Sequence, residues 1–116
     1  VVFSAFVRDG GHAAMRELLR RDLDVELVFA VNDVMALGAM TAAREAGAAV
    51  PGDLAFAGFD DIPALRDVTP TLTTVRIDMV DIGRRVTALA LREEGDPRLV
   101  TVGGEVVLRD STPARP

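Results

Sequence analysis

Two pairs of polar residues could bind a small polar molecule. Asn32-Asp33 and Asp60-Asp61 each follow a short apolar run of the sequence, with Phe59 directly before the second pair. A carboxylate can accept hydrogen bonds from two neighbouring hydroxyls, and an amide both donates and accepts, so these side chains suit a polyol such as a sugar. Asn is also a preferred N-cap of helices and Asp is common in turns. From spacing alone, helix capping by Asn32 and a turn at Asp60 remain open alternatives.

Catalytic, metal and cofactor chemistry find little support in the residue types. His12 is the single histidine, Ser4 and Ser111 are the only serines, and cysteine is absent. No nucleophile stands in a G-x-S-x-G turn, and no phosphate-cradling G-x-x-x-x-G-K-[ST] motif is present. All thirteen basic residues are Arg, so the Lys that a phosphoacceptor domain needs beside its acids is missing. We therefore expect no enzyme, no metal site and no cofactor.

Apolar runs predict the strands that would position the two polar pairs. The runs 1–7, 27–31 and 54–58 are short, continuous and apolar, and helical patterns separate them. Unbroken apolar strands that alternate with helices are typical of a parallel sheet buried on both faces. In such sheets, ligands gather at the carboxyl ends of the strands, which is where both polar pairs fall.

Two helices are predicted between these strands. The first covers 12–21, with Asp9 as an upstream cap, and the second covers 33–46. The second helix is apolar almost all round, so it must be covered on two sides. One side would meet the sheet, and the other needs a second layer or another subunit.

The C-terminal part adds a further strand and helix. Thr73 to Ile77 reads as a strand, and an apolar stripe at helical spacing predicts a helix from Met79 to about Glu94, with arginines on the opposite face. The runs 99–102 and 105–109 are β-prone, and Ser111 to Pro116 reads as a polar, frayed tail.

The composition describes a globular chain that binds nucleic acid poorly by itself. It has 116 residues, 49% of them hydrophobic, and a net charge of −5 spread along its length. No apolar run approaches the roughly 18 to 20 residues that span a bilayer, and the start lacks the charged region of a signal peptide. There is no initiator Met and the chain begins inside an apolar run, so we expect it to be part of a larger protein.

Several blocks of the sequence, in order and with matching spacing, closely resemble the C-terminal part of LacI/GalR-family transcriptional regulators. The blocks are VFAVNDVMALGA (28–39), REAG (44–47), VPGDL (50–54), GFDDI (58–62), PTLTTVR (70–76), GR (83–84) and RDST (109–112). The resemblance implies an α/β fold with a parallel sheet flanked by helices, a partial periplasmic-binding-protein-like type I fold. It assigns 1–72 to the C-terminal effector-binding subdomain, 73–104 to a crossover strand and helix of the N-terminal subdomain, and 105–116 to a return strand and tail.

The resemblance also implies roles for individual residues. Asp60 matches the acid that hydrogen-bonds effector hydroxyls, Asn32 lines the same cleft, and Phe59 matches an aromatic position beside the acid. Ile77 stands where some sugar-responsive members carry Gln, so one polar effector contact is missing here.

The second predicted helix matches a helix at the subunit interface of the family. Val34, Leu37 and Thr41 are the residues expected to face the second subunit of a homodimer. Such a contact would supply the second cover that the composition of this helix requires.

The function implied by the resemblance is effector sensing and dimerisation in a cytoplasmic regulator. The effector would be a sugar or a nucleoside-like molecule, and DNA would be bound only by an N-terminal helix-turn-helix that this chain does not contain. No membrane contact is expected. A periplasmic-type sugar-binding transport receptor of the same fold is the alternative.

Overall fold

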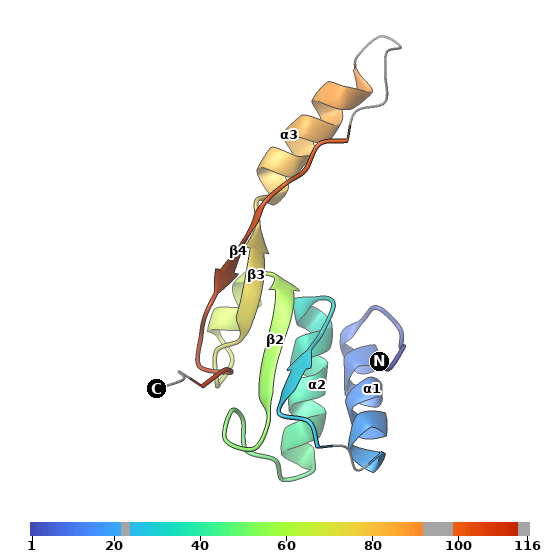
Figure 1. The fold of residues 1–116 in the computed structure, drawn as a ribbon, viewed down its shortest axis with the longest axis vertical. Coiled ribbons are helices and arrows are strands. Elements are labelled where there is room, and N and C mark those ends of the chain that lie inside the picture. The colour runs from blue at the N-terminus through green and yellow to red at the C-terminus, as the bar shows by residue number, and fades with distance from the viewer. Residues whose placement is uncertain (22–23, 92–98, 114–116) are drawn as a thin grey trace.

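The computed structural model describes residues 1–21, 24–91 and 99–113. These residues form a four-stranded sheet with helices packed beside it and one helix projecting from its end (Figure 1). The elements in chain order are α1 (Arg8–Arg20), β1 (Leu27–Phe29), α2 (Asp33–Glu45), β2 (Ala55–Asp60), the 3-10 helix η1 (Pro63–Arg66), β3 (Thr73–Ile77), α3 (Met79–Ala90) and β4 (Gly104–Val107).

The sheet has the strand order β1-β2-β3-β4. The first three strands are parallel, with Phe29 beside Ala57 and Phe59 beside Val75, while β4 runs antiparallel to β3 with Val106 beside Val75. The predicted parallel sheet flanked by helices is therefore confirmed, with one antiparallel strand added at its edge. The carboxyl ends of β1 and β2 lie at the same edge, which brings the two polar pairs of the sequence to neighbouring positions.

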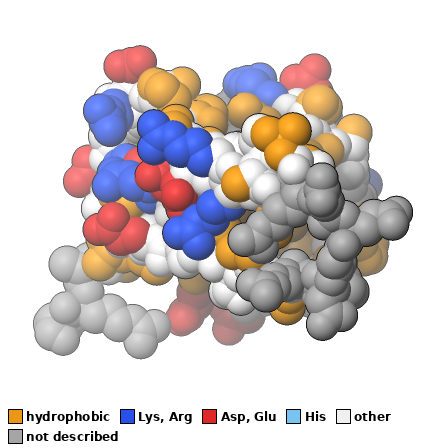
Figure 2. Space-filling model, turned by 90° about the horizontal axis from the view of Figure 1, so that it is seen from above, with side chains coloured by type: hydrophobic (Ala, Val, Ile, Leu, Met, Phe, Trp, Pro, Cys, Tyr) orange, Lys and Arg blue, Asp and Glu red, His pale blue; other side chains and the backbone are white. Residues whose placement is uncertain are grey.

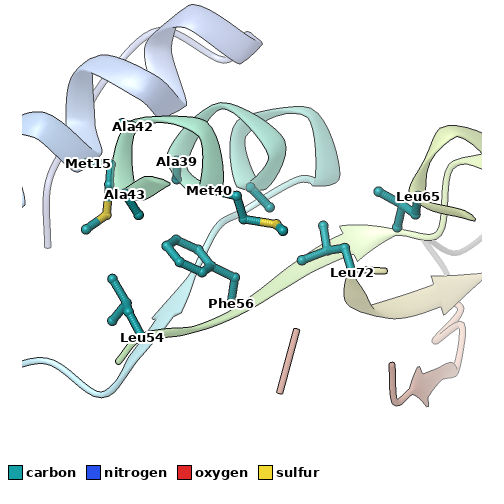
Figure 3. Packing of buried hydrophobic residues seen from close by; sticks show 10 residues of the cluster. Met15, Ala39, Met40, Ala42, Ala43, Leu54, Phe56, Leu65 and Leu72 are labelled. Atoms are coloured by element: carbon teal, nitrogen blue, oxygen red, sulfur yellow. The ribbon is translucent and has the colours of Figure 1, made fainter. Parts of the chain in front are cut away.

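The core lies between the sheet and α2, and α1 packs alongside α2 (Figure 3). Phe56 of β2 and Met40 of α2 are completely buried, and Met15 of α1 joins the same cluster. Fully burying side chains of this size contributes about 1.5–3 kcal/mol each. The structure thus provides α1 as a second layer over α2, as its apolar composition required.

Close packing of the two helices depends on glycines. A Cβ on Gly38 of α2 would clash with the carbonyl oxygen of Arg8, and a Cβ on Gly11 of α1 would clash with the carbonyl oxygen of Met35. The two helix backbones can approach this closely only because both positions lack a side chain. Gly11 therefore lies inside α1, which begins at Arg8, although the sequence places the helix start at His12.

The N-terminal prediction of a strand over Val1 to Val7 is wrong. These residues have no regular structure, and Val7 is the N-cap of α1, so Asp9 lies in the first helical turn instead of capping it. Strand formation needs a neighbouring strand to pair its backbone groups, and none of the described strands pairs with this segment.

The expectation that the sheet is buried on both faces is also wrong for the described residues. Because side chains alternate along a strand, Phe29, Phe59, Val75 and Val106 share the face that α2 does not cover. Phe29 is 57% exposed and Val106 is 63% exposed. The apolar runs 27–31 and 54–58 therefore predict strands correctly, but they do not predict that one face of the sheet is exposed.

Helix α3 stands apart from the rest of the chain (Figure 1). None of its described residues is buried, and Val86 on its apolar stripe is 59% exposed. The radius of gyration is 17.0 Å, whereas a compact domain of this length has about 13 Å. The helix was predicted to reach Glu94, but 92–98 lie outside the described residues.

The C-terminal residues return to the sheet. The β-prone run 99–102 has no regular structure, and the predicted strand 105–109 appears as β4. Ser111 is completely buried, its backbone nitrogen donates to Thr71 and its hydroxyl donates to the carbonyl oxygen of Phe56 at 2.7 Å. The prediction of a frayed tail is therefore wrong for Ser111, because its polar groups are paired between β2 and β3.

The surface agrees with the mixed charge of the sequence. On the face seen from the α3 end, acidic and basic side chains lie among each other, beside hydrophobic ones (Figure 2). None of the described helices is long and apolar enough to cross a membrane.

Candidate functional site

Asn32 caps helix α2 at the carboxyl end of β1. Its Oδ1 accepts a hydrogen bond from the backbone N–H of Met35 at 2.8 Å, and the residue is 6% exposed. The capping interpretation is thus confirmed. The amide nitrogen of the same side chain makes no hydrogen bond with the described residues, so it can still donate to a ligand.

Asp33 is a buried carboxylate that joins three parts of the fold. Its Oδ2 accepts from the backbone N–H of Ile62 at 2.9 Å and its Oδ1 accepts from the hydroxyl of Thr74 at 2.6 Å. Gly58 leaves the space, because a Cβ there would clash with Oδ1. Burial raises the pKa of Asp33, and the hydrogen bond from Thr74 opposes this shift. Asp33 therefore fixes the start of α2 against β3 and the turn after β2, and it is not available to a ligand.

Asp60 is the last residue of β2 and is half-buried. Its φ angle is 114°, a conformation that L residues rarely adopt, and its carboxylate makes no hydrogen bond with the described residues. An acceptor without a protein partner at the carboxyl edge of a parallel sheet is suited to binding hydroxyl groups. Asp60 ends β2, and Asn32 lies just beyond the end of the neighbouring parallel strand β1, so the structure brings Asp60 and Asn32 to the same edge of the sheet. The negative charge of Asp60 also contributes to the raised pKa of Asp33, which follows Asn32 in the chain.

The structure shows no contact of the Phe59 or Ile77 side chain with the two candidate effector residues. Phe59 is half-buried on the sheet face that α2 leaves uncovered, next to Val75. Ile77 ends β3 and pairs with Gly104. No described contact joins either side chain to Asn32 or Asp60.

Asp61 forms an ion-pair cluster that sequence reasoning missed. Its Oδ2 accepts from Nε of Arg76 at 2.7 Å, and its Oδ1 accepts from Nη2 of Arg109. Burial acts to raise the pKa of the Asp61 carboxyl, but the hydrogen bonds and charges of Arg109 and Arg76 outweigh it and lower the pKa. Both arginines belong to sequence blocks of the family resemblance, yet nothing in their spacing connects positions 61, 76 and 109.

The residues predicted for a dimer interface form a half-buried stripe along α2. Val34, Leu37 and Thr41 share one face at helical spacing, and each is only partly covered. The Thr41 hydroxyl donates to the carbonyl oxygen of Leu37 at 2.9 Å and accepts from Arg8 of α1 at 3.0 Å. The interface itself stays a prediction.

An apolar cavity of about 500 Å³ lies between the N-terminal segment, α1 and β1. Its lining includes Phe3, Phe6 and Phe29, and it reaches Val31 and Met35 on either side of Asn32. The sequence does not predict this cavity, because the apolar run 1–7 indicates a strand. Among the described residues, no group of three or more acidic, His or Cys side chains is arranged to hold a metal ion.

The structure is an α/β domain with polar groups at one edge of its sheet that have no partner among the described residues. A family model described as periplasmic binding protein-like domain matches residues 4–112. The chain belongs to this family, as the C-terminal part of the effector-binding domain of LacI-type regulators. The resemblance stated from the sequence is thereby confirmed.

The individual relatives are transcriptional regulators. The HTH-type transcriptional regulator GalS of Salmonella typhimurium is 49% identical over 83 residues, which cover 72% of this chain and 24% of GalS. The solved structure of the transcriptional regulator CelR in complex with cellobiose has a TM-score of 0.87 and 35% identity over 93% of this chain and 34% of that one. A LacI family regulator from Enterococcus faecium with bound ribose has a TM-score of 0.78 and 29% identity over 96% of this chain and 42% of that one. The chain thus spans a quarter to less than half of the proteins it matches.

Proposed function

We propose that this chain is the effector-sensing and dimerisation part of a LacI-type DNA-binding transcriptional regulator, and that it binds a sugar or related polar molecule. The observation that carries the proposal is the carboxylate of Asp60, which has no partner among the described residues and lies at the same carboxyl edge of the sheet as Asn32. Cellobiose and ribose in the two similar solved structures support a sugar as the ligand class.

The proposed mechanism is closure of two subdomains around the effector. Residues 1–72 would form one wall of the effector site, with Asn32 and Asp60. The crossover segment 73–104 would lead to the second subdomain, and 105–116 would return from it to the first. The exposed apolar stripe of α3 fits a helix that packs on the second subdomain. A ligand that binds the closed state more tightly shifts the population toward it, and this shift would reach the DNA-binding domains.

DNA contact is assigned to a helix-turn-helix outside this chain, in agreement with its net charge of −5. Dimerisation is assigned to the α2 stripe of Val34, Leu37 and Thr41. The relatives are named as transcriptional regulators, which favours a cytoplasmic regulator over a transport receptor and over an enzyme.

A thermal-shift screen of the intact regulator tests the ligand class. Cellobiose, ribose, galactose and lactose would be compared with adenosine and guanosine, each against the wild type and the Asp60→Asn variant. We expect at least one sugar to raise the melting temperature of the wild type and to have little effect on the variant. A shift by nucleosides alone would overturn the sugar assignment, and equal shifts in both proteins would overturn the site.

A further inference from the structure

The carboxylate of Asp61 binds both chain segments that lead to and from α3. Arg76 is on β3, which directly precedes α3, and Arg109 follows β4, which returns from it. The two guanidinium groups occupy opposite oxygens of the one carboxylate. A single side chain therefore holds the two connections together beside the candidate effector site.

The two ion pairs differ in burial. The side chain of Asp61 is 5% exposed and that of Arg109 is 11% exposed, whereas that of Arg76 is 45% exposed. Arg109 also donates to the carbonyl oxygen of Leu72 at 2.8 Å, so its guanidinium is fixed by two partners. Because solvent screens exposed pairs, the Arg109 pair should dominate and the Arg76 pair should contribute less.

The backbone connects this cluster to Asp60. Asp60 and Asp61 have φ angles of 114° and 57°, and they are the only described residues other than glycine with positive φ. Such conformations persist when the surrounding contacts hold them in place. The side-chain contacts that hold this turn are those of Asp61 and the bond from the N–H of Ile62 to Asp33, because the Asp60 side chain has no partner among the described residues.

We propose that Asp61 is a positioning residue. It orients Asp60 toward the effector, and through Arg109 and Arg76 it couples Asp60 to the two crossing segments, which are the chain segments that lead to and from α3. The proposal rests on the proposed function, since it assumes that Asp60 binds the effector. It predicts that effector affinity depends on arginines that the effector does not touch. The ligand-binding edge and the crossing segments would then move as one unit.

The test is a set of affinity measurements on the intact regulator by calorimetry, with the sugar that gives the largest thermal shift. Asp61→Asn and Arg109→Gln should each weaken binding about tenfold, and the double variant should be no weaker than either single variant. Arg109→Lys, which keeps the charge, should recover part of the loss. Asp81→Asn is the matched control, because Asp81 forms an exposed ion pair with Arg85 on α3 at 2.6 Å and should leave affinity unchanged.

Each outcome separates the proposal from the function on which it rests. If Asp60→Asn weakens binding while Asp61→Asn and Arg109→Gln bind like the wild type, the positioning role is wrong and the effector site stands. If Asp60→Asn binds like the wild type, the effector site itself is wrong. Losses that add in the double variant, or that Arg109→Lys does not reduce, would show general destabilisation and overturn the coupling. Affinities are measured well below the melting temperature of each variant, so that loss of folded protein does not contribute.

Discussion

The hydroxyl of Thr74 donates to Oδ1 of Asp33 at 2.6 Å, and both residues are buried. This contact fixes the first turn of α2 against the neighbouring strand β3, and the bond from Ile62 to the second oxygen fixes the turn after β2. The candidate effector residues on either side, Asn32 and Asp60, are thus held by a carboxylate that no ligand reaches.

The Asp33 contacts predict different effects for two substitutions. Asp33→Ala should lower the free energy of unfolding by about 1–3 kcal/mol, since the N–H of Ile62 and the hydroxyl of Thr74 lose their buried acceptor. Asp33→Asn should cost about 1 kcal/mol or less, because the amide can accept from Ile62 and donate to Thr74. Urea unfolding of both variants measures this, and equal losses would contradict the assigned contacts.

Asp61 and Asp33 should have opposite effects on how the free energy of unfolding changes as the pH falls. The lowered pKa of Asp61 contributes stability that is present above the ordinary aspartate value of 3.8 and is lost as the pH falls through the folded-state pKa. The raised pKa of Asp33 has the reverse effect, because the folded state takes up its proton first and gains stability as the pH falls toward 3.8. Between about pH 6 and about pH 3.5, Asp61→Asn should lose less stability than the wild type and Asp33→Asn should lose more. Urea unfolding of the wild type and both variants at the two pH values measures these losses. Equal losses of stability in all three proteins would contradict both pKa shifts.

Glycine substitutions should separate a packed helix from an exposed one. Gly38→Ala should destabilise the chain by about 1–3 kcal/mol, because the new Cβ clashes with the backbone of α1. Gly83→Ala is the matched control on α3, where nothing lies within 4 Å of the new Cβ, and it should stabilise the helix by about 0.5–1 kcal/mol. Thermal melts of the two variants would refute the packing if Gly38→Ala proved neutral.

Asn32 variants should separate its capping role from its proposed effector role. Asn32→Ala loses the acceptor for Met35 and should cost about 1 kcal/mol of stability. Asn32→Asp keeps the acceptor, so its stability should stay near that of the wild type, but it lacks the amide donor and should bind the sugar more weakly. Unchanged sugar affinity in Asn32→Asp, measured by calorimetry, would restrict Asn32 to capping.

The chain by itself should associate with other copies. Val86 and Leu91 at α3 and Phe29 and Leu108 at the sheet are exposed apolar side chains that water solvates unfavourably. Light scattering over a range of concentrations should therefore show a mass that rises with concentration. A stable, compact monomer at all concentrations would contradict this prediction.

Local patterns were enough to predict most strands and helices, because each apolar run or stripe lies within one element. The prediction failed where a structure depends on distant partners. Val1 to Val7 are apolar but have no strand to pair with, and Gly11 lies within a helix because it packs on Met35.

The candidate site likewise contains residues that local patterns predict and residues that depend on distant partners. Asn32 as a cap follows from its place before an apolar helix, and Asp60 stood out through its position after a strand. The cluster of Asp61 with Arg76 and Arg109 joins three distant positions, and only the fold brings them together. The burial of Asp33 likewise depends on Thr74, which lies 41 positions away.

The most direct test is calorimetric titration of the intact regulator with the sugar that gives the largest thermal shift. We predict one binding site per chain in the wild type and in the Asp81→Asn control, and an affinity about 10- to 100-fold lower in Asp60→Asn, because a hydrogen bond to a charged acceptor is lost. Equal affinity in Asp60→Asn and the wild type would contradict the assignment of this edge of the sheet as the effector site.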